Sequence, residues 1–167
     1  LNGGVTAWIL QSSTDSLSDK VRRELAAHGC GTVCCLTNER FANWSSETVA
    51  AALAMHVGED CRAILLPGNS RGEEAAPLLA ERLQSAWIPD VLTMAVTRQG
   101  TIEVTAVEPG GRLSRTYRST GDRPAVLTIR PGVAEARRLD DNNDLTSSTC
   151  PLREVEVDLS GIPELTS

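Results

Sequence analysis

A glycine-flanked segment around Ser70 holds the residue types of this sequence that are best spaced for chemistry. Gly68, Ser70 and Gly72 form the Gly-x-Ser-x-Gly pattern of a nucleophile elbow, and they follow a short apolar run as that elbow does in an α/β hydrolase. Such an enzyme needs its acid and then its histidine after the serine. His28 and His56 are the two histidines of the chain and both precede Ser70, so we do not expect hydrolysis.

The same segment can be interpreted as a cradle for an anion such as a phosphate. Its glycines let the backbone approach a ligand, and the N–H groups of Arg71, Gly72 and Glu73 would point at it from the first turn of a helix. However, Ser70 and Glu73 have the Ser-x-x-Glu spacing of a capping box, which satisfies the helix end internally, and the carboxylate repels phosphate. Both interpretations stay open here, and the candidate anion or nucleotide ligands are Gly68, Ser70, Arg71 and Gly72.

A second candidate is Arg130, which lies within the segment Thr128–Gly132. Pro131 and Gly132 form a rigid turn at the end of a strand-like run, so we expect the Arg130 guanidinium to project at a sheet edge. An exposed arginine at a strand end is also common without any function.

The cysteines, five in number, show no metal-binding or redox pattern. They lie at irregular spacing and include no Cys-x-x-Cys pair. We expect small buried thiols, with the neighbours Cys34 and Cys35 on opposite faces of a strand. The alternatives are a metal site with His28 and redox chemistry. The positions are Cys30, Cys34, Cys35, Cys61 and Cys150.

Short apolar runs alternate with helical repeats in this sequence, which is the pattern of βαβ units that form a parallel sheet. These strands and helices must position the candidate residues. The first half predicts strands at residues 5–10, 32–36 and 62–66, and helices from Ser16 to Gly29, from Ser45 or Ser46 to Val57, and from Ser70 to Leu83. Pro77 lies beyond the first turn of the third helix, so we expect a kink or a restart there. The second half predicts strands at residues 91–96, 102–107, 113–117 and 125–129, a polar loop over 137–151 and a last edge strand over 154–159.

The predicted fold is α/β, a three-layer sandwich with a mostly parallel central sheet made of the first four strands. The later hairpin adds an antiparallel β extension. A length of 167 residues favours one domain over residues 1–167. Because aromatic residues are only 3% of the chain, the core must be aliphatic.

Charge and hydropathy exclude two classes of partner. Sixteen basic and 22 acidic residues give a net charge of −6, which argues against a nucleic-acid partner. No apolar run approaches the roughly 18 residues of a membrane span, and no basic leader precedes an apolar stretch. We expect a cytoplasmic protein whose chain, beginning with Leu1, starts downstream of a start codon.

Taken in order, these motifs resemble the N-terminal domain of the electron transfer flavoprotein alpha subunit family. Residues 69–80 match the family's Thr-Ser-x-Gly-Arg-Asp-x-Ala-Pro-x-x-Ala loop and helix, with Pro77 included. Residues 85–90 match a turn with an aspartate, 108–111 a Pro-x-Gly-Gly-like hairpin, 128–132 a Thr-x-Arg-Pro-Gly strand end, and 154–157 a Glu-Val-type strand. In place of Gly-Arg-Asp this chain has Gly72-Glu73-Glu74, with an arginine displaced to Arg71.

The resemblance implies the adenine nucleotide alpha hydrolase-like superfold and FAD-dependent electron transfer by the complete protein. In the family the FAD lies mainly in a second, C-terminal domain that residues 1–167 lack, so we expect no cofactor, metal or catalytic residue on this chain alone, and a colourless protein. A beta-like subunit is the implied partner; the redox partner, a dehydrogenase or an acceptor, stays open. Arg130 is expected nearest to any flavin.

A free-standing adenine-nucleotide-binding domain of the same superfold is the alternative function. The beta subunit of the family holds an adenine nucleotide near its equivalent of the loop from Gly68 to Gly72. That resemblance keeps a nucleotide-binding role for this loop open.

Overall fold

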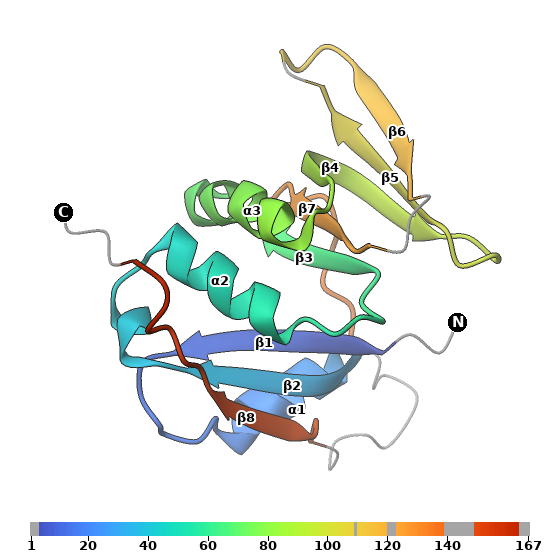
Figure 1. Ribbon diagram of the computed structural model, residues 1–167. Coiled ribbons are helices and arrows are strands. Elements are labelled where there is room, and N and C mark those ends of the chain that lie inside the picture. Colours follow the sequence, from blue (N-terminus) through green and yellow to red (C-terminus); the bar gives the residue numbers. More distant parts are fainter. Residues whose placement is uncertain (1–3, 109, 120–122, 139–148, 164–167) are drawn as a thin grey trace. The chain divides into compact units, whose positions relative to one another are not determined.

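The computed structural model describes residues 4–108, 110–119, 123–138 and 149–163 (Figure 1). The chain divides into two compact units, one over residues 46–134 and the other over residues 2–45 and 135–167. Pro109 of the expected hairpin and residues 139–148 of the expected polar loop lie outside the described residues. Each unit is therefore described by itself.

The unit of residues 2–45 and 135–167 is built on a parallel three-stranded sheet. Its strands are β1 (Val5–Gln11), β2 (Cys30–Thr37) and β8 (Leu152–Glu156), in the order β1-β2-β8. The central strand is buried on both faces, as its continuous apolar run predicts, because the side chains from Val33 to Leu36 are at most 2% exposed. Helix α1 (Asp19–Ala27) joins β1 to β2, and the 3-10 turn η1 (Glu39–Ala42) follows β2.

Helix α1 starts later than the sequence predicts. The expected N-cap was Ser16, but the helix begins at Asp19 and its N-cap is Ser18, whose side chain makes no capping hydrogen bond. The predicted end is confirmed: Gly29 follows the helix with φ 89°, a left-handed conformation that glycine adopts without strain.

The unit of residues 46–134 combines two helices with a five-stranded sheet. Helix α3 packs on β3, β7 and β4, and helix α2 packs on α3 (Figure 1). The strand order is β3-β7-β4-β5-β6, parallel from β3 to β4 and antiparallel from β4 to β6. The elements are α2 (Ser46–His56), β3 (Ala63–Pro67), α3 (Ser70–Leu83), β4 (Trp87–Val96), β5 (Ile102–Val107), β6 (Ser114–Arg118) and β7 (Ala125–Ile129).

The α/β class, the parallel pairing and the antiparallel extension are confirmed, but the expected strand arrangement is wrong. Hydrogen bonding divides the first four strands between two sheets, and β7 lies between β3 and β4. The physical reason is that local periodicity specifies where a strand forms, whereas its hydrogen-bonding neighbour is set by contacts far along the chain. The sheet is completed by Ala125–Ile129, which the sequence places correctly as a strand.

Helix α3 runs from Ser70 to Leu83 as one element, so of the kink or restart expected at Pro77 the restart is wrong. A proline inside a helix removes its own N–H from the helical ladder, and its ring crowds the carbonyl group four residues earlier. The residues around it, Ala75, Ala76, Leu79 and Ala80, are at most 4% exposed, so packing against the rest of the unit holds the turns on both sides together.

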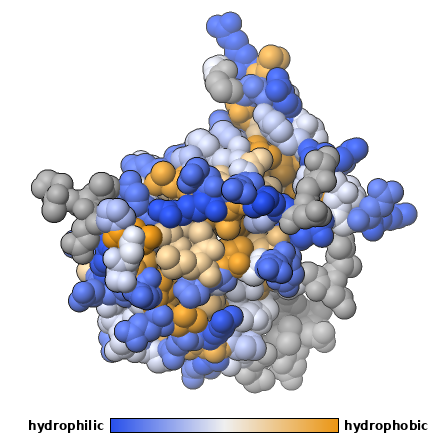
Figure 2. All heavy atoms as spheres, viewed as in Figure 1, coloured by the Kyte–Doolittle hydropathy of each residue, from blue (hydrophilic) through white to orange (hydrophobic). Residues whose placement is uncertain are grey.

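Within the described residues, no helix is long and apolar enough to cross a membrane. Apolar and charged side chains are interspersed over the face drawn in Figure 2. The large apolar side chains that are exposed include Met94, Val96 and Leu113, all in the antiparallel extension.

Candidate functional site

The carboxyl ends of β3 and β7 bring together the two segments that the sequence singles out separately. The N–H of Gly68 donates to the carbonyl of Ile129 at 2.7 Å, and the N–H of Arg130 donates to the carbonyl of Val91 at 3.1 Å. The loop of residues 68–72 and the arginine therefore lie at one edge of the parallel strands, which we call the β3–β7 edge. Ligands of open α/β sheets bind outside this end of the strands.

Close backbone packing explains both glycines of the loop. A Cβ atom at Gly68 would lie 2.6 Å from the Ile129 carbonyl oxygen, and one at Gly72 would lie 1.8 Å from the Pro67 carbonyl oxygen. Gly72 is buried in the first turn of α3. The glycines thus let the strand end and the helix start pack directly on the neighbouring backbone, which accounts for them without a ligand.

Asn69, rather than Ser70, caps helix α3. The Asn69 side-chain oxygen accepts a hydrogen bond from the N–H of Gly72 at 3.0 Å, and its carbonyl accepts from the N–H of Glu73 at 2.9 Å. The expected capping box of Ser70 and Glu73 is therefore wrong, although the expectation of a self-satisfied helix start holds. Asparagine ranks with serine as an N-cap, and the extended backbone of Asn69 suits that position.

The same two hydrogen bonds bear on the anion interpretation. Of the three N–H groups expected to point at a phosphate, those of Gly72 and Glu73 already bond to Asn69. The Ser46 hydroxyl also donates to the carboxylate of Glu74 at 3.1 Å, so an anionic group is held beside this helix start. The loop geometry therefore favours a structural turn over a phosphate cradle.

Arg130 directly follows β7 and is exposed, and it forms a two-pronged ion pair with Asp90. Its Nε donates to Asp90 Oδ1 at 2.6 Å and its Nη2 to Asp90 Oδ2 at 2.5 Å. This hydrogen bonding, followed by the Coulombic attraction of the carboxylate, raises the pKa of Arg130 above its ordinary value. The pair joins the residue after β7 to the irregular part of β4 between Ile88 and Val91, so the guanidinium is held in one orientation at the β3–β7 edge.

Sequence reasoning missed the role of Asp90. It lies where the pairing of β4 with β7 shifts between Ile88 and Val91, and it has φ 53°, in the left-handed region. Asp is one of the residue types that tolerate this conformation. The Pro-Asp sequence within a strand-like run was the available signal for such an irregularity.

The histidines give no support to a hydrolase at Ser70. The His28 ring bonds through Nδ1 to the Arg137 carbonyl at 2.8 Å and through Nε2 to Glu24 at 3.3 Å, within the unit of residues 2–45 and 135–167. His56 is the last residue of α2. Among the described residues, no group of three or more His, Cys, Asp or Glu side chains is placed to hold a metal ion.

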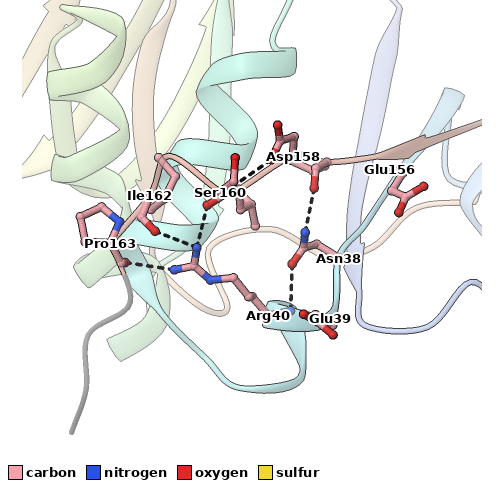
Figure 3. Close-up of a pocket in the computed structure, with 10 residues that line it drawn as sticks. Asn38, Glu39, Arg40, Glu156, Asp158, Ser160, Ile162 and Pro163 are labelled. Atoms are coloured by element: carbon pink, nitrogen blue, oxygen red, sulfur yellow. Dashed lines mark hydrogen bonds between the residues drawn. The ribbon is translucent and has the colours of Figure 1, made fainter.

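An open pocket of ≈ 850 Å³ lies between η1 and the chain after β8 (Figure 3). The carboxylates among its lining residues are those of Glu39, Glu156 and Asp158. The N–H of Ser160 donates to Asp158 at 2.9 Å and lowers the pKa of that carboxyl group. Three acidic groups make this pocket unsuitable for a phosphate.

The arginine of this pocket holds the chain rather than a ligand. Arg40 donates to the carbonyl oxygens of Leu159 at 2.8 Å, Ile162 at 2.9 Å and Pro163 at 3.0 Å. Figure 3 shows its guanidinium reaching toward Ile162 and Pro163. Asn38 adds a hydrogen bond from its side-chain nitrogen to the Val157 carbonyl at 2.7 Å. These bonds hold residues 157–163 against the end of β2.

Comparison with known proteins assigns the chain to a family. Residues 2–160 match the electron transfer flavoprotein domain. The electron transfer flavoprotein subunit alpha of Clostridium acetobutylicum is 29% identical over 83% of this chain and 41% of its own length, and that of Thermoanaerobacterium thermosaccharolyticum is 27% identical over 75% and 38%. Protein FixB of Clostridium saccharobutylicum is 27% identical over 93% of this chain and 44% of its own length. The chain thus spans about two-fifths of the length of these relatives, and it belongs to the electron transfer flavoprotein domain family, as the N-terminal domain of an alpha-like subunit.

Proposed function

We propose that this chain docks an electron transfer flavoprotein alpha-like subunit onto a beta-like subunit and acts as the scaffold for the part that carries the flavin. The observation that carries the proposal is the family match over residues 2–160, in a chain that spans only about two-fifths of its relatives. On this proposal residues 1–167 are one domain, a three-layer sandwich of the adenine nucleotide alpha hydrolase-like superfold. The complete protein is an electron carrier rather than an enzyme, and this domain supplies no catalytic residue.

The chemistry of the pocket beside Arg40 does not suit FAD. The pocket beside Arg40 is lined by three carboxylates that would repel the diphosphate, and none of its lining residues is aromatic. The N–H groups of Arg40 are directed to backbone carbonyls. We therefore propose that FAD binds outside this chain, in the remainder of the complete protein, where it would supply one-electron and two-electron chemistry.

The antiparallel extension offers a surface for the beta-like subunit. Met94 and Val96 pair directly with Val104 and Ile102 of β5, so all four side chains lie on one face of the sheet. Val104 and Ile102 are buried, whereas Met94 is 42% and Val96 47% exposed. Apolar side chains at the centre of a patch are typical of protein interfaces, so we propose that the beta-like subunit covers this face.

A matched pair of substitutions on β4 tests the docking surface. Met94→Lys places a charge on the apolar face, whereas Thr93→Lys places the same charge on the opposite face, where Thr93 is also exposed. In the complete alpha-like protein, co-purified with the beta-like subunit of the same organism, we expect Met94→Lys to weaken association at least about tenfold. Thr93→Lys should leave association unchanged. Equal affinities of both variants and wild type would exclude this face as the interface.

For the flavin, we propose that the β3–β7 edge faces the remainder of the complete protein and that Arg130 is the nearest residue of this domain. Asp90 fixes the orientation of the Arg130 guanidinium, which supports this role. A guanidinium that is already oriented binds an acceptor group without losing further side-chain entropy. Arg130→Ala in the complete protein should lower the flavin absorbance at about 450 nm or weaken docking. Arg98→Ala, another exposed arginine, is the control. An unchanged flavin content and affinity would refute the role of Arg130 and leave the docking proposal standing.

Two further parts of the proposal concern the isolated chain. We propose that it purifies colourless and works in the cytoplasm, which its five free thiols support.

Titration calorimetry with AMP and ATP tests the alternative of a free-standing nucleotide-binding domain. A dissociation constant tighter than about 100 μM would favour that alternative. The hydrogen bonds that the N–H groups of Gly72 and Glu73 donate to Asn69 weigh against it.

A further inference from the structure

Two cysteines that are 120 residues apart in the sequence meet at the start of β2. Cys30 is the first residue of β2, and Cys150 lies two residues before β8. The Cys150 thiol donates to the Cys30 carbonyl at 3.0 Å. The parallel pairing of β2 with β8 starts at the same place, where the N–H of Val33 donates to the Pro151 carbonyl at 2.9 Å. Both ends of this contact are therefore fixed by the sheet.

Helix α1 also holds the backbone of Cys150. The Arg22 guanidinium donates to the Cys150 carbonyl through Nε at 3.0 Å and through Nη2 at 2.7 Å. The Cys30 thiol donates to the Thr32 carbonyl at 3.0 Å. Such anchoring keeps the two side chains in one neighbourhood and lowers the ordering cost of joining them.

The two thiol groups also act on each other. Burial raises the pKa of Cys150 most, and the negative charge and hydrogen bonding of the Cys30 side chain raise it further, while Arg22 lowers it. A direct interaction between the side chains agrees with the geometry of the backbone contact. Their accessibilities differ: Cys150 is 2% exposed, whereas Cys30 is only half-buried.

We propose that Cys30 and Cys150 form a reversible disulfide by exchange with a low-molecular-weight disulfide. The half-buried Cys30 reacts first: its thiolate attacks one sulfur of the small disulfide, whose S–S bond breaks and releases one small thiolate. Cys150 then loses its proton to solvent and attacks the Cys30 sulfur, which releases the second small thiolate. Overall the protein loses two electrons and two protons, and the small disulfide gains them as two thiols.

The other cysteines are placed differently. Cys34 and Cys35 are successive residues of β2 and point to opposite faces, and both are buried. Cys61 belongs to the unit of residues 46–134, where its thiol donates to the Ala63 carbonyl at 3.4 Å. In a reducing compartment the pair of Cys30 and Cys150 stays as thiols, and the cross-link forms when small disulfides accumulate.

The cross-link would tie the chain that enters β8 to the start of the central strand of its sheet. Since the loop it closes contains about 120 residues, the entropy lost by the unfolded chain is large. We expect the melting temperature of the oxidised chain to exceed that of the reduced chain by roughly 10 °C.

The test is to incubate the whole chain with oxidised glutathione, trap free thiols and measure thiol number and mass. The free thiols should fall from the five of the sequence to three, with a mass loss of about 2 Da and no glutathione adduct. Trypsin cleaves after Arg23, Arg40, Arg138 and Arg153. The linked product should therefore join residues 24–40 to residues 139–153, and dithiothreitol should separate them.

Single serine substitutions assign the pair. Cys30→Ser and Cys150→Ser should each abolish the mass loss and the gain in melting temperature, whereas the matched control Cys61→Ser should keep both. Because Cys150 is buried, Cys30→Ser is the decisive variant if Cys150→Ser does not fold. A count of five free thiols after oxidation, a stable glutathione adduct on wild type, or a cross-link that survives in Cys30→Ser would overturn the proposal.

Discussion

Replacing Gly72 with alanine adds one methyl group at the third residue of α3. Helix propensity predicts that this change raises the free energy of unfolding, whereas tertiary packing predicts that it lowers it. In an exposed helix, alanine is favoured over glycine by about 1 kcal/mol. At this position, however, the new Cβ would lie 1.8 Å from the carbonyl oxygen of Pro67 and 3.0 Å from its carbonyl carbon. The contact has to open to at least 3.0 Å, the lower limit for real Cβ atoms.

The neighbouring atoms cannot yield easily, because they belong to backbone. Pro67 is the last residue of β3 and pairs with Ile129 of β7. Overpacking of this kind costs about 3 kcal/mol, so the net loss after the propensity gain is about 2 kcal/mol. For a chain of this length that corresponds to a fall in melting temperature of roughly 4–8 °C.

Thermal melts and denaturant titrations followed by circular dichroism measure this loss. The matched control is Gly161→Ala, because a Cβ at Gly161 meets no atom within 4 Å. Its free energy of unfolding should stay within about 0.5 kcal/mol of wild type. A Gly72→Ala variant that melts at or above the wild-type temperature would refute the reasoning, since propensity alone would then decide the outcome.

Three further predictions concern single side chains. Thr128→Val should raise the free energy of unfolding by about 1 kcal/mol, because the fully buried Thr128 hydroxyl has no hydrogen-bond partner among the described residues; a lower melting temperature would contradict this. Glu108→Gln should lower the pKa of Tyr117, the single tyrosine of the chain, because the 2.9 Å hydrogen bond to Glu108 raises that pKa above its ordinary value of 10.0. The raised pKa means that the pair stabilises the fold below pH 10.0 and loses this effect as the pH rises through the folded-state pKa; an ultraviolet titration identical to wild type would argue against it. Arg40→Ala should speed amide hydrogen exchange in residues 157–163 at least about tenfold, because Arg40 bonds three carbonyl oxygens there, and unchanged protection would show that other contacts hold this segment.

Local pattern was enough to predict most of the elements. The strand Ala125–Ile129 and the helix Ser70–Leu83 have the predicted bounds, and the buried strand around Val33–Leu36 is confirmed. These features follow from apolar periodicity and from residues such as Gly29, whose effect on the backbone is local. The same patterns, compared with a known family, supported the correct family assignment.

Caps and irregularities were predicted less well, because several residue types can satisfy the same local need. Asn69 and Ser70 are both good N-caps, and only the folded structure decides that Asn69 accepts the hydrogen bond from Gly72. Pro77 should interrupt an isolated helix, but the burial of its neighbours on α3 outweighs both the lost hydrogen bond and the crowding of the proline ring against the preceding turn.

Contacts between distant segments were decided by the tertiary structure alone. Strand β7 enters between β3 and β4 and so brings Arg130 to Asp90, 40 residues earlier in the chain. The return of the chain at β8 likewise brings Cys150 to Cys30. Sequence periodicity carries no information on strand order, because the free energy of pairing depends on which surfaces are buried together once the whole unit has folded.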